Sequence, residues 1–320
     1  MTINNSSQDK YAFYGKNIKS FQKDENCMVF IMKDATGKGI MTSYDVFPGI
    51  KLMYNDFHMQ GCFSEFRLNV QMLAIDHCRE GRIEFLNGSY MYLNEGDLQI
   101  STKSNHVHAF GFPLHYYQGI TIGIHLDEAI EALASTFEEF SIDLQALREK
   151  FNYDNHSFMI RTTESIQHIF SELYSVPEKI RIHYYRIKIL ELLLFLSAVD
   201  VSKNRESRPY FPKKQVDAVK KIMDYIRGHM DQHITLIELS NRFDIPLTAM
   251  KNCFKAIYGQ SIYAYLRTYR IEKAAYLLRK TDDTITTIAG RVGYSNPSKF
   301  AAAFKEIKGM PPTKYQKNFV

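Results

Sequence analysis

Residues 284–309 read TITTIAGRVGYSNPSKFAAAFKEIKG. Apolar side chains recur at helical spacing over residues 285–292, and a Gly-Tyr-Ser turn follows at 293–295. Asn296 is a good N-cap, and Pro297 fits the first position of a second helix. The stretch therefore predicts a helix, a tight turn and a second helix.

A second copy of this unit lies earlier in the chain. Residues 234–259 read ITLIELSNRFDIPLTAMKNCFKAIYG, and both copies end in FKxIxG. The second-helix halves align at an offset of fifty residues and the first-helix halves at forty-nine, with one residue inserted at the turn. In this copy, Ile237, Leu239 and Phe243 are expected to face inward. The shared pattern indicates one structural unit used twice.

A helix-turn-helix places its second helix in the major groove of DNA. Hydroxyl, amide and lysine side chains lie on the predicted outer faces of the two second helices and can contact bases and phosphates. They are Thr248, Lys251, Asn252 and Lys255 in the first copy, and Ser298, Lys299 and Lys305 in the second. The alternative is that two helical hairpins pack a small domain and their polar faces only meet water.

The spacer between the copies favours DNA binding. Residues 261–281 predict one helix of about 30 Å, at 1.5 Å per residue. Major-groove faces on one side of B-DNA recur about every 34 Å. Its apolar residues also change face along its length, as a helix that bridges two subdomains requires.

The charge is unevenly distributed. The chain of 320 residues has a net charge of +5, but residues 212–320 carry 19 Lys+Arg and 9 Asp+Glu, whereas residues 1–211 carry 21 and 26. A basic C-terminal part suggests a polyanionic partner for that part, although a basic solvated surface would have the same composition.

The first part of the chain predicts strands. Short segments rich in Val, Ile, Tyr and Phe are separated by turn signals such as Glu80-Gly81 and Asn87-Gly88. These segments are 26–32, 47–57, 69–78, 82–86, 89–93, 97–101 and 115–126. Many short strands with glycine turns are typical of an antiparallel barrel or sandwich.

Helical periodicity begins at Asp127. A longer helix is expected over 178–199, and it is apolar almost all round from Ile189 to Leu196, which favours a contribution to a subunit interface. The sequence thus predicts an α+β protein of two domains, an antiparallel β-barrel with helices and an all-α domain with two helix-turn-helix units joined by a long helix. The expected boundaries are 1–125 for an effector-sensing barrel, 126–199 for a helical dimerisation region, 200–214 for a linker and 215–320 for the DNA-binding domain.

The last third of the chain resembles the DNA-binding domain of the arabinose-regulator family, AraC/XylS. The resemblance spans about residues 215–317 and rests on YLRTYRIEKAAYLL, on ITTIAGRVGYSNPSKFAAAFKEIKG and on MPPTKY. YSNPSKFAAAFK and FKAIYGQSIYAYLR are most similar to the subgroup related to the pyochelin regulator, which senses ferric siderophores.

The resemblance implies sequence-specific binding to promoter DNA, a cupin-like barrel for a small-molecule effector, and a homodimer. RNA polymerase is a further expected partner. It also implies that Ala301 and Ala302 face DNA, where family members often have a long polar or basic side chain near position 302. Copy one is therefore expected to carry more of the base readout.

The barrel offers two readings of its polar residues. Tyr54, Arg67, Tyr90 and Tyr92 are candidate lining residues for an effector, because barrel interiors can hold one small ligand. His106-Val-His108 resembles part of a cupin metal motif, but the carboxylate expected after it is missing, so neither a metal nor a cofactor is expected. The alternatives are a cupin-type metalloenzyme with a helical appendage and a regulator controlled by a protein partner.

The chain shows no sign of export or membrane insertion. The start MTINNSSQDK has no basic and apolar signal pattern, and no apolar run approaches the roughly 20 residues of a membrane span. The four cysteines, at 27, 62, 78 and 253, form no CxxC pair. A non-enzymatic cytoplasmic protein without a membrane partner is expected.

Overall fold

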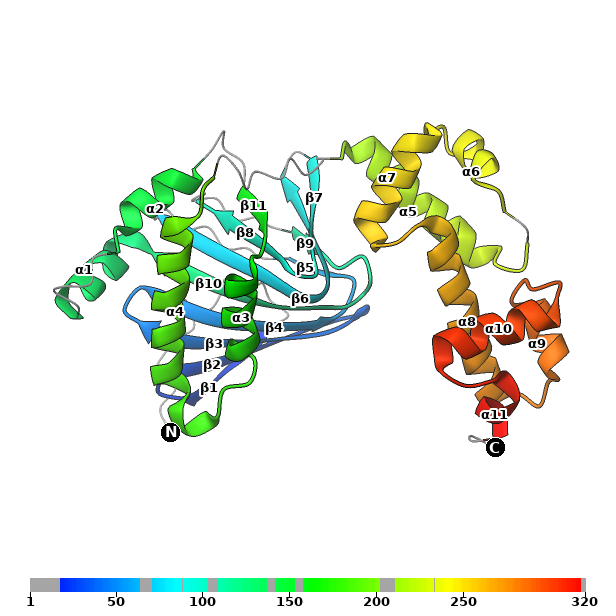
Figure 1. Ribbon diagram of the computed structural model, residues 1–320, viewed down its shortest axis with the longest axis horizontal. Helices are drawn as coiled ribbons and strands as arrows, with labels where there is room; N and C mark the ends of the chain where they lie inside the picture. Colours follow the sequence, from blue (N-terminus) through cyan, green and yellow to red (C-terminus); the bar gives the residue numbers. More distant parts are fainter. Residues whose placement is uncertain are drawn as a thin grey trace. The chain divides into compact units, whose positions relative to one another are not determined.

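An antiparallel sheet forms the N-terminal part of the protein and a bundle of short helices forms the C-terminal part (Figure 1). The computed structural model describes residues 18–63, 71–87, 89–102, 109–136, 142–152, 158–201, 211–232 and 234–317. The chain divides into unit 1, Met1–Tyr210, and unit 2, Phe211–Val320. Residues 202–210 of the predicted linker lie outside the described residues.

The sheet of unit 1 has antiparallel pairings throughout its described part. Its strands are β1 (Ile18–Asp24), β2 (Cys27–Asp34), β3 (Gly37–Phe47), β4 (Ile50–His58), β5 (Gly61–Phe63), β6 (Met72–Asn87), β7 (Ser89–Asn94), β8 (Asp97–Ser101), β9 (Ala109–Gly111), β10 (Tyr117–His125) and β11 (Phe158–Arg161). The main path runs β1-β2-β3-β4-β10-β6-β8-β11, while β7 and β9 pair with the far half of β6. The predicted antiparallel fold is confirmed.

Each face of this sheet covers an apolar core. The outer face packs against α1 (Leu126–Thr136), α2 (Leu144–Phe151), α3 (Glu164–Leu173) and α4 (Arg181–Ala198), as Figure 1 shows for α3 and α4. A second apolar cluster lies on the inner face. It joins Phe30 of β2 and Met41 of β3 to Phe85 of β6, Leu93 of β7 and Met159 of β11. Because this cluster joins both ends of the sheet, the strands curve around it as a barrel.

One long strand replaces two predicted ones. The prediction of a turn at Glu80-Gly81 is wrong, because β6 continues through it. The pairing with β10 skips Arg79, so this residue forms a β-bulge, and Gly81 takes a left-handed φ of 81°. A bulge followed by a glycine bends a strand without ending it. The sequence signal of a turn and that of a bent strand are the same here.

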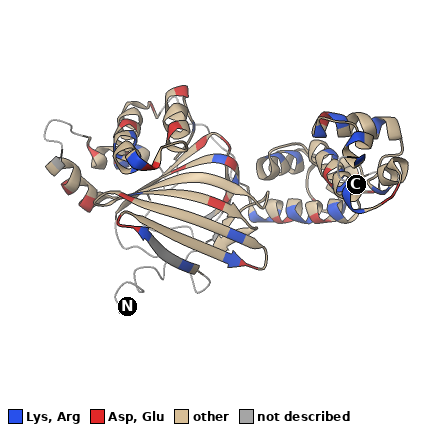
Figure 2. Cartoon of the chain, turned by 90° about the horizontal axis from the view of Figure 1, so that it is seen from below, with Lys and Arg blue, Asp and Glu red and all other residues tan. Residues whose placement is uncertain are grey.

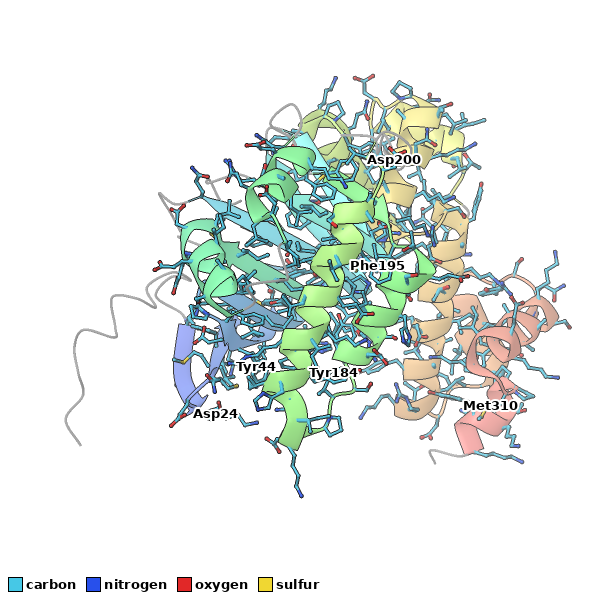
Figure 3. The ribbon with its side chains drawn as sticks, turned by 60° about the vertical axis from the view of Figure 1, so that its left-hand side comes forward. Asp24, Tyr44, Tyr184, Phe195, Asp200 and Met310 are labelled. Carbon is cyan, nitrogen blue, oxygen red and sulfur yellow. The ribbon has the colours of Figure 1, made fainter. Side chains whose placement is uncertain are left out.

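The segment after β10 contains more than helices. β11 pairs with β8 inside the stretch predicted to be helical, and α3 follows it. α4 covers the sheet with the face that carries Tyr185, Ile189 and Leu192. Tyr44 of β3 lies beside the N-terminal end of this helix, where it contacts Tyr185 (Figure 3).

Unit 2 contains two helix-turn-helix units around one long helix. Its helices are α5 (Lys213–Gly228), α6 (Leu236–Arg242), α7 (Leu247–Tyr258), α8 (Ile262–Lys280), α9 (Ile285–Arg291), α10 (Pro297–Lys308) and α11 (Pro312–Lys317). α6 and α7 form the first unit, α9 and α10 form the second, and α8 is the spacer. None of the helices in the described part of the chain is long and apolar enough to cross a membrane.

The two turns repeat in backbone detail. Ile245 N donates to Ser240 O at 3.1 Å, and Tyr294 N donates to Ala289 O at 2.9 Å, at the predicted offset of forty-nine. The residue before each donor is left-handed: φ is 48° at Asp244 and 82° at Gly293.

Helix α6, the first helix of the first helix-turn-helix unit, buries only some of the positions predicted to face inward. Leu239 is buried, and Phe243 is partly buried. Ile237 is 65% exposed, so the expectation that it faces inward is wrong. Helix α6 is only seven residues long, and its position 237 falls on the open side.

Candidate nucleic-acid interface

Helix α7 separates an apolar side from a polar side. Met250, Phe254 and Ile257 are fully buried beneath it. The predicted contact residues of the first copy, Thr248, Lys251, Asn252 and Lys255, are all exposed on it. The helix ends at Gly259, which adopts a left-handed φ of 83° and donates its N–H to Lys255 O at 2.8 Å. A rigid core therefore fixes the direction of one polar helix face.

Helix α10 repeats this division with fewer polar groups. Asn296 caps it, because its Oδ1 accepts from the N–H groups of Ser298 (2.9 Å) and Lys299 (3.1 Å). Phe300 and Phe304 are buried. The predicted contact residues Ser298, Lys299, Ala302 and Lys305 are exposed, and Ala301 is partly exposed.

The lysines of α10 have two different roles. Lys308 binds Glu272 of α8, with both Nζ–O distances at 2.6 Å, so it fastens α10 to the spacer. Lys305 and Lys299 form no ion pair with any carboxylate of the described residues. Their charges therefore remain available to a phosphate.

One guanidinium group of the spacer helix joins the two halves of unit 2. Arg270, near the middle of α8, donates to Met230 O (Nε, 2.8 Å) and to Gln232 O (Nη2, 2.9 Å), both between α5 and α6. The same group lies 5.9 Å from the ring centre of Tyr294, at the turn of the second unit. Sequence reasoning missed this residue, and its only signal was the change of apolar face along the spacer.

Basic side chains are dense on unit 2. Figure 2 shows Lys and Arg on most of its helices, whereas much of the sheet of unit 1 carries neither charge. Some of these charges are paired within the unit, for example Arg267 with Glu306 (Nη1–Oε1 2.9 Å). The exposed side of α7 carries lysines without a carboxylate beside them, which suits a polyanion.

Comparison with known proteins identifies the repeat. Residues 239–318 match the family described as a helix-turn-helix domain. A putative AraC-like transcription regulator of Streptomyces lividans is 38% identical over 84 residues, which are 26% of this chain and 28% of that protein. The C-terminal domain of AraT, a response regulator from Geobacillus stearothermophilus, is 32% identical and covers 32% of this chain and 84% of its own, with a TM-score of 0.31.

The C-terminal part of the chain is a DNA-binding domain of the AraC/XylS type. The resemblance noted from the sequence is thus confirmed, while the pyochelin-regulator-like subgroup remains a prediction. ToxT from Vibrio cholerae covers 84% of this chain and 99% of its own at 15% identity and a TM-score of 0.32. The chain spans 28%, 13% and 46% of the length of the first curated AraC-type and related regulators that it matches.

Those residues predicted to line an effector site that the structure describes do not face the inner cluster. Tyr54 lies on the outer face of the barrel, where its hydroxyl donates to Leu173 O of α3 at 2.6 Å. Tyr90 and Tyr92 alternate with Met91, whose side chain belongs to the inner cluster, so both tyrosines point the other way. Arg67 lies outside the described residues.

The histidines of the barrel make no metal cluster in the described residues. No group of three or more His, Cys, Asp or Glu side chains there could hold a metal ion. His106 and His108, which suggested part of a cupin motif, lie outside the described residues. His77 is buried on the outer face and stacks on Phe170 at 4.0 Å between ring centres.

Proposed function

We propose that this protein is a transcription regulator that binds promoter DNA through α7 and α10. The observation that carries the proposal is the repeat of one helix-turn-helix unit on a single spacer helix, with both second helices exposing polar side chains. α8 has 19 residues, or about 28 Å at 1.5 Å per residue, close to one turn of B-DNA. The matching family and the names of the relatives agree with it.

The barrel of unit 1 is proposed to be a cupin-like site for a small-molecule effector. The strands enclose an apolar inner cluster whose side chains come from both halves of the sheet. Small barrels of this kind can hold one ligand in their interior. The bound effector would then alter DNA binding or contacts with RNA polymerase.

Mobility shift with DNA from upstream of a regulated promoter tests the proposed function. We expect binding in the presence of excess unrelated DNA, with an affinity that falls steeply as salt increases. Equal affinity for promoter and unrelated DNA would contradict sequence-specific regulation.

Two substitutions should separate base readout from phosphate contact. Asn252→Ala should relax the base preference at one position by about 1–3 kcal/mol, because an asparagine amide pairs with a base edge. Lys305→Ala should weaken binding to all sequences alike and lower the salt slope by about one. Lys221→Ala, at an exposed lysine of α5 outside both helix-turn-helix units, is the matched control. If Lys305→Ala behaved like this control, the proposed orientation of α10 would be wrong.

We further propose that α4 forms the interface of a homodimer. One face of α4 covers the sheet, but Ile187 (61%) and Leu194 (43%) are exposed on the other. They continue a seven-residue spacing that begins at Ile180 (48% exposed) just before the helix, and Phe195 is 40% exposed beside them (Figure 3). Heptad spacing is the pattern by which two copies of one helix pair.

Introducing charge into this stripe should give monomers. Ile187→Glu combined with Leu194→Glu should halve the mass measured by sedimentation, because each chain would bury two glutamates at the interface. Ile130→Glu, which changes an isoleucine of α1 that is 40% exposed, should leave the mass unchanged. A wild-type chain that sediments as a monomer at micromolar concentration would contradict the proposal.

A further inference from the structure

The inner face of the barrel carries a continuous belt of side chains at one level. Cross-strand pairing places seven residues next to one another, from β2 across β3, β4, β10, β6 and β8 to β11. In order they are Met28, Ser43, Met53, Thr121, Asp76, Gln99 and Met159. Met28, Met53 and Met159 belong to or pack against the inner apolar cluster, which fixes the direction of the whole belt. The belt therefore contains a polar run, Thr121–Asp76–Gln99, with methionine on either side.

The hydrogen bonds of the polar run leave acceptors open. Asn55 Nδ2 donates to Thr121 Oγ1 at 2.9 Å, and Thr121 Oγ1 donates to Asp76 Oδ1 at 2.7 Å. The threonine hydroxyl has only one hydrogen, and Asp76 takes it. Gln99 is 3% exposed, and its Oε1 has no hydrogen-bond partner. The run thus ends in two acceptors, the second oxygen of Asp76 and the Gln99 Oε1.

These acceptors lie within reach of one ligand atom. Asp76 and Gln99 are directly paired across β6 and β8, and the Cβ atoms of such pairs are about 4.5–5.5 Å apart. Along the strands, their level borders on the paired residues Gly123 and Ala74, and the atoms nearest to a Cβ added at Gly123 would be the terminal methyl groups of the flexible Met53 and Met72, at 3.4 and 3.7 Å. Asp76 and Thr121 accordingly remain partly exposed although they lie on the inner face.

The carboxylate has no cationic partner among the described side chains. Burial raises the pKa of Asp76 to about 6, and the hydrogen bond from Thr121 opposes this only in part. At neutral pH the group is therefore largely ionised in an apolar setting. A largely desolvated carboxylate of this kind is stabilised by a cation that also donates hydrogen bonds.

We infer that Thr121, Asp76 and Gln99 form the polar end of an effector site that binds an organic amine in its protonated form. An ammonium group has three donors and no acceptor, which matches two open acceptor oxygens. The apolar part of the ligand packs against Met28, Met53 and Met159, whose flexible side chains adapt to different shapes. This inference rests on the proposed function of unit 1 as an effector-binding barrel.

Three probes with one tail and different head groups test the inference. n-Octylamine, n-octanol and n-octanoate are titrated into the full-length protein at neutral pH and followed by calorimetry. We expect octylamine to bind at least tenfold more tightly than octanol, and octanoate to bind least. Preference for octanol or octanoate, or no binding of any probe, would overturn the inference.

Variants locate the binding to the polar run. Asp76→Asn keeps the shape and removes the charge, and it should weaken octylamine binding at least tenfold while leaving octanol binding within about twofold. Gln99→Met should weaken octylamine binding severalfold. Asp56→Asn is the matched control, because Asp56 lies on the outer face of β4 and accepts from Gln118 Nε2 at 3.1 Å. Equal octylamine affinity in Asp76→Asn and Asp56→Asn would exclude the polar run as the site.

Promoter binding by the same preparations distinguishes the two proposals. A protein that binds promoter DNA but does not distinguish the head groups retains the regulator function and loses the amine site. A protein that binds octylamine through Asp76 but shows no sequence-specific DNA binding retains the site and loses the proposed regulator function.

Discussion

Gly293→Ala is expected to destabilise unit 2 by about 3 kcal/mol and to weaken DNA binding at least tenfold. Gly293 has a left-handed φ of 82°, and an added Cβ would lie 2.4 Å from Met230 O and 2.8 Å from Arg270 Nη2. Left-handed backbone costs an alanine about 1–2 kcal/mol. The clash adds to this cost, because Met230 O and the Arg270 guanidinium group are the two partners of a hydrogen-bonded contact within unit 2.

Two control variants separate strain from collision. Gly309→Ala meets the same kind of backbone, with a φ of 74°, but its Cβ would have nothing within 4 Å, so it should lose only about 1–2 kcal/mol. Asp244→Gly changes the equivalent residue of the first unit, which has a φ of 48°, and should be neutral or slightly stabilising. Urea denaturation and mobility shift measure both effects. Equal losses in Gly293→Ala and Gly309→Ala would show that the contact with Met230 and Arg270 is unimportant.

The stability of the barrel should depend on pH through His77 and Asp76. Their effects oppose each other and become visible when either residue is replaced. Burial lowers the pKa of His77 from 6.5 to about 4, with nearby Gln167 opposing the shift without completing a hydrogen bond. Burial raises the pKa of Asp76 from 3.8 to about 6. The unfolded chain binds the histidine proton first as pH falls, whereas the folded chain binds the aspartate proton first. His77 therefore adds stability as pH rises from about 4 to 6.5, and Asp76 removes stability as pH rises from about 4 to 6.

For each residue, the pKa difference between the folded and the unfolded chain changes the free energy of unfolding by about 3 kcal/mol at most, at 1.36 kcal/mol for each pKa unit. In Asp76→Asn, the barrel should gain stability relative to wild type as pH rises through this range. In His77→Phe, it should lose stability over the same range. Hydrogen exchange of the strands, corrected for the intrinsic rate at each pH, measures unit 1 separately from unit 2. Curves of both variants that stay parallel to wild type would contradict this assignment.

The fold of the C-terminal unit could be predicted in detail, because the residues that determine each helix and turn lie close together in the sequence. Caps, turn residues and helical periodicity all lie within the repeat, and the comparison of two copies revealed the one-residue difference at the turn. Arg270 could not be found in this way, because its partners Met230 and Tyr294 are brought together only by the packing of the spacer.

The interior of the barrel could not be predicted because both faces of its strands are apolar. Ile75 and Ile122 face the helices, while Cys78 and Tyr117 of the same strands face the inner cluster. Alternation of apolar and polar residues normally indicates which side is buried, and here both sides are. The tyrosines predicted as lining residues therefore face away from the inner cluster, and a polar residue such as Asp76 did not indicate which face it lies on.

Arg270 contacts both the segment that leads into the first helix-turn-helix unit and the turn of the second, and this has a consequence for the operator. Because one side chain of the spacer contacts both the segment before α6 and the turn before α10, we expect one chain to read its two DNA segments in a fixed helical phase. An insertion of about half a turn, or five base pairs, between the segments would carry the second one to the far side of the duplex. Operator phasing would therefore reveal which segments are read by one chain.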